Sequence, residues 1–132
     1  MGALTTPMPA DVAAVFTGLP PVLRDVRALI FETADALEVG PLTEALRWGE
    51  PAYLTDSTKA GSTVRLGVKE GQAVVFFICH TGLLDGFRSD FPELPTLGNR
   101  GIIVEDGFDR AALALCLSRA LTYHRTKREV RA

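Results

Sequence analysis

Cys79 and His80 are adjacent residues whose side chains could do chemistry. A thiol beside an imidazole can provide a thiolate nucleophile or two metal ligands. Neighbouring residues of a strand point to opposite faces, so the two groups converge only if the strand ends there. Cys79 also lies in an apolar run, where a reduced cysteine commonly packs as a small hydrophobic residue. An enzyme that uses Cys79 or His80 is therefore an alternative, and the sequence assigns no catalytic residue.

The common catalytic signatures are absent from the chain. It contains no Gly-rich phosphate loop, no His-Glu-x-x-His, no Cys-x-x-Cys and no Gly-x-Ser-x-Gly motif. Whether the protein is an enzyme stays open, and we expect a non-enzymatic function.

Three polar clusters lie at the ends of predicted strands. They are Gly61-Ser62-Thr63 with nearby Arg65, His80-Thr81-Gly82, and Gly98-Asn99-Arg100. Each glycine allows the backbone to approach another group closely. The hydroxyls, the amide and the arginines, with Arg88 as a further candidate, could together hold a carboxylate or a phosphate. The alternative is that the glycines form turns and the polar groups satisfy the loop backbone.

Trp48 and Tyr53 flank the bend Gly49-Glu50-Pro51-Ala52. Pro51 fixes its own φ and disfavours a helical conformation at Glu50, so we expect a helix to end here and a strand to begin. Both aromatic side chains carry a polar group, which suits either a half-buried structural corner or the wall of a pocket.

These features predict a binding module for a small anionic ligand or a protein partner. The candidate ligand-binding residues are Trp48, Tyr53, Arg65, Thr81 and Arg100.

Two groups of carboxylates are candidates for a metal site. They are Asp25, Glu32 and Asp35 on one face of a predicted helix, and Glu105, Asp106 and Asp109 before the last helix. Hard cations prefer oxygen ligands of this kind. The first group is interleaved with Arg24 and Arg27, as on a solvated helix surface, and acids of the second group can cap a helix N-terminus. We therefore assign no metal site and no cofactor from these residues.

Apolar periodicity predicts five helical segments. They cover residues 11–18 with Asp11 as the N-cap, 21–39, a short helical turn at 42–47, a helix or ordered loop at 83–91, and 110–123 with Asp109 as the N-cap. The second segment carries the clearest stripe, formed by Val22, Val26, Leu29, Ile30, Thr33 and Leu37. In the last helix the apolar stripe is Leu113, Cys116, Leu117, Ala120 and Leu121, and the cations that follow suit the end of a helix.

In the middle of the chain the apolar residues recur at every second position, the pattern of a β-strand. Val64, Leu66 and Val68 alternate with polar residues, and residues 70–72 predict a hairpin turn. Residues 73–79 are apolar throughout and predict a central strand, and residues 100–104 predict another. This order predicts an α+β fold, with an antiparallel sheet packed against N- and C-terminal helices.

Length and composition indicate a single domain over residues 1–132, with a core at about 22–123, a flexible arm at 1–10 and a basic tail at 125–132. The net charge of −2 disfavours nucleic-acid binding. No apolar stretch is long enough to span a membrane, and the N-terminus lacks the pattern of a secretory signal. Two cysteines are too few for a disulfide framework, so we expect a cytoplasmic protein, either a monomer or a homodimer.

The pattern Trp48-Gly-x-Pro-x-Tyr53, between a leading helix and a hairpin, resembles the YdhG-like family of proteins of unknown function. The resemblance spans roughly residues 22–123 and implies a frataxin-like α+β sandwich. One member of that family has been described as a frataxin-like iron chaperone, so the resemblance also implies iron binding as an alternative function. The acidic helix face would then supply Asp25, Glu32 and Asp35, although Arg24 and Arg27 depart from the expected acidic ridge.

Overall fold

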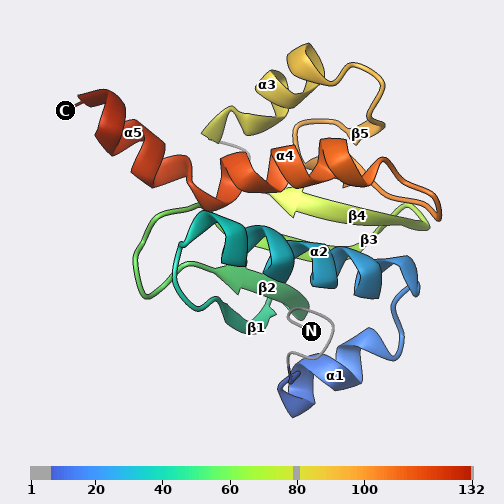
Figure 1. Cartoon of the computed structure of the whole chain (residues 1–132). Helices are drawn as coiled ribbons and strands as arrows, with labels where there is room; N and C mark the ends of the chain where they lie inside the picture. Colours follow the sequence, from blue (N-terminus) through green and yellow to red (C-terminus); the bar gives the residue numbers. More distant parts are fainter. Residues whose placement is uncertain (1–6, 79–80, 132) are drawn as a thin grey trace.

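The structure, a computed structural model, describes residues 7–78 and 81–131 (Figure 1). Its helices are α1 (Ala10–Phe16), α2 (Val22–Leu37), α3 (Leu83–Asp90), α4 (Arg110–Leu121) and α5 (Tyr123–Arg131). Its strands are β1 (Thr43–Arg47), β2 (Glu50–Leu54), β3 (Val64–Lys69), β4 (Gln72–Phe77), β5 (Thr96–Leu97) and β6 (Gly101–Ile103). The strands form one antiparallel sheet in the order β1-β2-β3-β4-β6-β5, which confirms the predicted α+β class.

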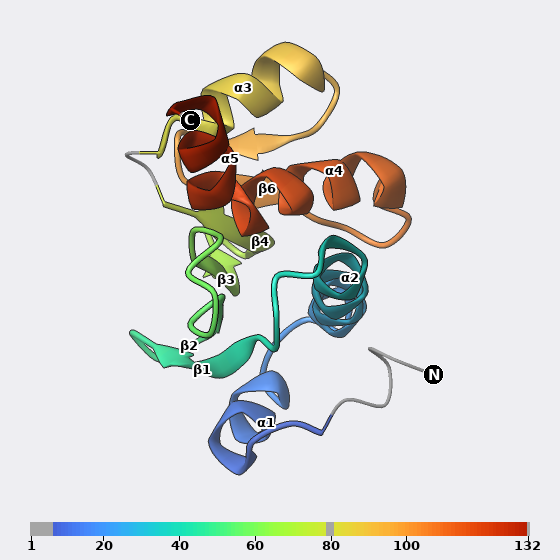
Figure 2. The same ribbon diagram turned by 60° about the vertical axis from the view of Figure 1, so that its left-hand side comes forward.

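Helices α2 and α4 lie side by side over one face of the sheet (Figures 1 and 2). In the predicted stripe of α2, Val22, Val26, Leu29 and Ile30 are buried and Thr33 and Leu37 are half-buried, because residues three and four apart fall on the same side of a helix. The predicted stripe of α4 is also buried, and Asp109 caps this helix by accepting a hydrogen bond from the Ala112 N–H at 3.0 Å. Both interpretations of periodicity in these two helices are thus confirmed.

Helix α1 packs under β1 and β2 and adds Val12 and Phe16 to the main core. The core therefore begins before residue 22. The predicted cap of this helix is wrong, because the helix starts at Ala10 and Asp11 lies inside its first turn. The Asp11 carboxylate instead accepts from the adjacent Val12 N–H at 2.8 Å.

Residues 43–47 form strand β1, and the predicted helical turn over 42–47 is wrong. These residues have adequate helix propensity, but propensity is a weak preference that tertiary contacts override. Here the chain pairs with β2 along its whole length, from Thr43 with Leu54 to Arg47 with Glu50. The strand that we predicted to begin near Pro51 is confirmed as β2, but the element before it is a strand and not a helix.

The hairpin of β3 and β4 agrees with the sequence prediction. Glu70 and Gly71 connect the strands with φ values of 53° and 76°, the left-handed pair that a two-residue type I′ turn requires. Strand β4 is buried from Ala73 to Phe77, as expected for a central strand. The predicted strand at 100–104 is present as β6, with the short strand β5 beside it, which the sequence did not indicate.

Beyond α4 the chain turns at Thr122 and continues as α5, so the described part of the predicted basic tail is helical. The Arg125 side chain donates to the Leu37 carbonyl at 3.1 Å, which joins α5 to the end of α2. Among the described residues, no helix is long and apolar enough to cross a membrane.

Candidate functional site

The sheet has a second face, opposite α2 and α4, that no described helix covers (Figure 2). The pairing register places Ala45, Ala52, Arg65, Phe76 and Gly101 in one row across this face. Side chains alternate between faces along each strand, so the neighbours of these residues, such as Val64 and Phe77, enter the core. Arg65 consequently lies near the middle of this second face, where its side chain is partly exposed and the neighbouring Ala52 and Phe76 are buried.

Arg65 is held between two aromatic rings. Its guanidinium carbon lies 5.2 Å from the centroid of the Trp48 ring and 5.0 Å from that of Phe76, both within the range of cation–π attraction. Its Nε also donates to the Glu50 carboxylate at 2.5 Å. We call Trp48, Glu50, Arg65 and Phe76 the Trp48 patch.

Glu50 reaches over the backbone of β3 at Gly67. A methyl group on Gly67 would collide with the Glu50 carboxylate, so the absence of a side chain there makes room for this acid. The carboxylate thus keeps its place beside Arg65, and the charges of the patch offset one another.

Trp48 occupies the turn between β1 and β2. It has φ 52° and is followed by Gly49 at φ 76°, the type I′ geometry that strongly prefers Asn-Gly. Trp48 is 85% exposed. Neither the turn nor the core favours a tryptophan at this position, and the cation–π contact of its ring is with Arg65, which makes Trp48 a functional candidate.

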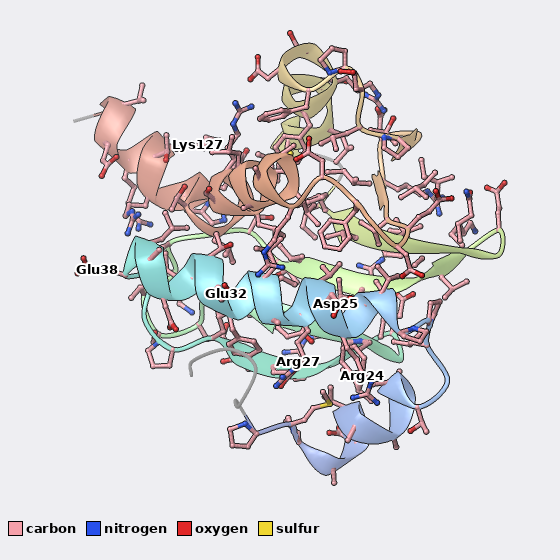
Figure 3. All side chains as sticks on the ribbon, turned by 45° about the vertical axis from the view of Figure 1, so that its right-hand side comes forward. Arg24, Asp25, Arg27, Glu32, Glu38 and Lys127 are labelled. Atoms are coloured by element: carbon pink, nitrogen blue, oxygen red, sulfur yellow. The ribbon has the colours of Figure 1, made fainter. Side chains whose placement is uncertain are left out.

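Tyr53, another predicted ligand residue, lies in the core on the other side of the sheet. Its hydroxyl group donates to the Glu44 carboxylate at 2.8 Å, and Glu44 pairs with Arg27 at 2.6 Å. Figure 3 shows Arg27 on the side of α2 that faces β1 and β2. Burial, followed by the Glu44 charge, raises the pKa of Tyr53 far above its usual value, while the hydrogen bonds that Arg27 donates to the Glu44 carboxylate raise the pKa of Arg27. The Arg27–Glu44–Tyr53 cluster ties α2 to the sheet.

Among the described residues, no hydrogen bond, ion pair or cation–π contact joins the other predicted ligand residues, Thr81 and Arg100, to the Trp48 patch. The Thr81 hydroxyl donates to the Ile78 carbonyl at 2.7 Å and accepts from the Leu83 N–H at 3.2 Å, which shapes the turn before α3. Arg100 is exposed in the connection from β5 to β6. The cluster Gly98-Asn99 is bound by Arg88, which donates to the Gly98 carbonyl and to the Asn99 side chain.

The cluster around Gly61 also has structural partners. The Gly61 N–H donates to the Thr55 hydroxyl at 2.8 Å, and the Ser62 N–H donates to the Ala120 carbonyl at 2.8 Å. These bonds join the loop before β3 to the end of α4. The backbone N–H groups of Gly61 and Ser62 thus follow the turn interpretation of this cluster.

The acidic residues of α2 point outward, as Figure 3 shows for Asp25 and Glu32. Glu32 pairs with Arg110 of α4 at 2.5 Å, and Asp35 is exposed. Within residues 7–78 and 81–131, no three His, Cys, Asp or Glu side chains are grouped closely enough to hold a metal ion.

Cys79 and His80, the candidates for nucleophile and base, lie outside the described residues. Cys116 is described and is fully buried on the inner side of α4. Burial raises the pKa of its thiol from 9.0 to about 12, with a smaller lowering effect from Arg119. The thiol form of Cys116 is therefore strongly favoured in the folded protein.

We predict that Cys116 reacts with iodoacetamide at pH 8 only after unfolding, since the thiolate is the nucleophile. Mass spectrometry of the peptide that contains Cys116 separates this reaction from that of Cys79.

The raised pKa of Cys116 also means that, between about pH 9 and 12, the native state retains a proton that the unfolded chain loses. The free energy of unfolding should therefore fall as the pH rises from about 9 towards 12, and less steeply in Cys116→Ala. Rapid alkylation in the native state, or equal pH slopes in the two proteins, would contradict this.

No protein-family model, curated protein or solved structure matches the chain. The YdhG-like resemblance therefore remains a prediction.

Two members of the Trp48 patch, Trp48 and Arg65, were predicted from the sequence as ligand-binding residues, whereas Phe76 and Glu50 were not. Phe76 was not predicted because its strand, β4, is apolar on both faces. In such a strand, periodicity does not show which side chains lie on the same face as Arg65. Glu50 follows a turn and lies across from Gly67 of β3, which leaves room for its carboxylate. This arrangement could not be predicted, because the pairing of β2 with β3 is visible only in the folded sheet.

Proposed function

We propose that the chain is a non-enzymatic binding module that recognises a protein partner through the Trp48 patch. The observation that carries this proposal is the exposed tryptophan in a turn position that favours asparagine. Tryptophan and arginine are the residue types that most often dominate the energy of protein–protein interfaces.

The patch is organised before any partner arrives. Arg65 is stacked against Phe76 and Trp48 and paired with Glu50, so few side-chain rotations need to be frozen when a partner binds. Binding that requires little ordering retains more of its interaction free energy.

A protein partner is favoured over a small anion because Arg65 is already paired. An anion would have to compete with Glu50, whereas a partner can cover the Trp48 ring with apolar side chains and leave the ion pair in place. Iron binding is supported by the family resemblance alone, since Glu32 is paired with Arg110 and Asp25 and Asp35 point to solvent.

The test begins with the selection of displayed peptides that bind the intact protein, followed by synthesis of those that lack tryptophan. Trp48 is the single tryptophan of the chain, so its fluorescence reports binding at the patch directly. We expect the emission to shift to shorter wavelength on binding, and affinity to fall at least about tenfold in Trp48→Asn. The stability of this variant should stay within about 1 kcal/mol of the parent, because asparagine suits the turn while the cation–π contact is lost.

Val130→Asn is the matched control, since Val130 is also a large exposed apolar residue at 82% exposure and lies in α5. This change should leave peptide affinity unaltered. Peptides that bind Trp48→Asn as tightly as the parent would refute the proposal, as would a selection that yields no binder. Titration with inorganic phosphate covers the anion alternative, which is favoured if phosphate alone changes the Trp48 emission and Arg65→Ala removes the effect.

A further inference from the structure

A second region of the molecule has the form of a ligand site and plays no part in the Trp48 patch. It is a cleft of about 450 Å³ between the segment that follows α3, strand β6 and the start of α4. Its volume falls in the range of sites that hold small organic molecules. We call it the β6–α4 cleft.

One wall of the β6–α4 cleft is apolar. Its apolar side chains come from three segments and include Phe91, Leu94, Ile102, Val104, Phe108 and Leu113. Ile102, Val104 and Leu113 belong to the buried core, whereas Phe91, Leu94 and Phe108 are partly exposed. A ligand with an apolar body would therefore cover surface that water now contacts, which favours binding.

The charged residues of the β6–α4 cleft are all acidic. They are Asp90, Glu93, Glu105, Asp106 and Asp109, and no Lys, Arg or His is among the described residues that line it. Clefts lined by charges of one sign raise the local concentration of oppositely charged ligands.

Two of these acids already have partners. Asp90 pairs with Arg119 at 2.6 Å, and Asp109 caps α4. The carboxylates of Glu93, Glu105 and Asp106 form no ion pair or hydrogen bond with any other described residue. Three negative charges at the rim are thus available to a ligand.

From this combination we propose that the β6–α4 cleft binds a small organic cation, an amine or guanidine with an aromatic or aliphatic body. The body lies against Phe91, Leu94 and Phe108, and the cationic group lies at the rim, next to Glu93, Glu105 or Asp106. A bare metal ion suits the cleft less well, because no three carboxylates among the described residues are grouped closely enough to hold one, and an ion would leave the apolar wall uncovered.

The experiment uses three probes of similar shape: phenethylamine, its neutral analogue 2-phenylethanol and the anion 3-phenylpropionate. Amide chemical shifts of the full chain are recorded during each titration. We expect phenethylamine to shift the signals of Leu94, Val104, Phe108 and Leu113, with an affinity several-fold higher than that of the neutral probe. The anion should bind most weakly, and added salt should reduce the difference between the probes.

The matched variants carry equal changes in net charge. Glu93→Gln with Glu105→Gln removes two rim charges, while Glu70→Gln with Glu129→Gln removes two exposed charges elsewhere. We expect the first pair to weaken phenethylamine binding about five- to tenfold and the second pair to leave it within about twofold.

Several results would overturn the proposal. These are equal binding of the amine and the neutral probe, equal effects of the two variant pairs, and shifts that fall outside the cleft or do not occur. A titration in which Mg²⁺ shifts the rim signals while phenethylamine does not would show a metal site instead. None of these outcomes bears on the Trp48 patch, which is tested by separate variants.

Discussion

Glu44→Ala is expected to lower the free energy of unfolding by about 3–5 kcal/mol, the loss typical when one partner of a buried ion pair is removed. The side chains of Arg27 and Glu44 are 6% and 5% exposed. Glu44 accepts from Arg27 at 2.6 and 2.8 Å and from the Tyr53 hydroxyl at 2.8 Å. Without the carboxylate, a buried guanidinium loses its counter-charge and the tyrosine hydroxyl loses its acceptor. Urea unfolding followed by circular dichroism measures the change.

The matched control is Glu32→Ala, because Glu32 forms an ion pair at 2.5 Å with Arg110 while both side chains are about half exposed. Exposed pairs contribute at most about 1 kcal/mol, so this variant should be close to the parent. The double variant Arg27→Met with Glu44→Leu should recover much of the stability lost in Glu44→Ala, since an apolar pair leaves no uncompensated charge. Similar losses in Glu44→Ala and Glu32→Ala would show that the Arg27–Glu44–Tyr53 cluster is not coupled by burial.

Gly61→Ala is expected to lower the free energy of unfolding by about 1–3 kcal/mol or more, as overpacking does in a close-packed interior. A methyl group on Gly61 would overlap the backbone of Leu121 at the end of α4, with the Leu121 Cα only 2.5 Å away. Backbone atoms cannot rotate out of the way as a side chain can. The hydrogen bond from the Ser62 N–H to the Ala120 carbonyl would also be lengthened. Thermal and urea unfolding both report the loss.

Gly86→Ala is the control, because here the same substitution is expected to raise the free energy of unfolding. Gly86 lies within α3, and the nearest atom to an added methyl group is the Arg119 Nη1 at 3.8 Å, an ordinary contact. Alanine in a helix interior is favoured over glycine by about 0.5–1 kcal/mol, so this variant should be slightly more stable than the parent. Equal stability of Gly61→Ala and Gly86→Ala would mean that the loop before β3 moves away from α4 without cost.

The contacts of Arg27 with Glu44 and of Gly61 with Leu121 cannot be predicted from the spacing of residues along the sequence. Arg27 was assigned to a solvated helix surface because it alternates with acids, yet it is buried against Glu44 of a strand that we expected to be helical. Gly61 was considered for a ligand site, and its small size is instead required by the end of a helix 60 residues later, at Leu121.

Elements that depend only on neighbouring residues could be predicted from the sequence. The apolar stripe of α2, the cap of α4 at Asp109 and the hairpin of β3 and β4 depend on spacings of two to four residues, and all three are present. Three other features become visible only in the folded chain: residues 43–47 pair as a strand, Tyr53 lies in the core, and Arg65 contacts Trp48 and Phe76. Each of these outcomes depends on which strands become neighbours, and that choice is made by the burial of the whole chain because local propensities are too weak to make it.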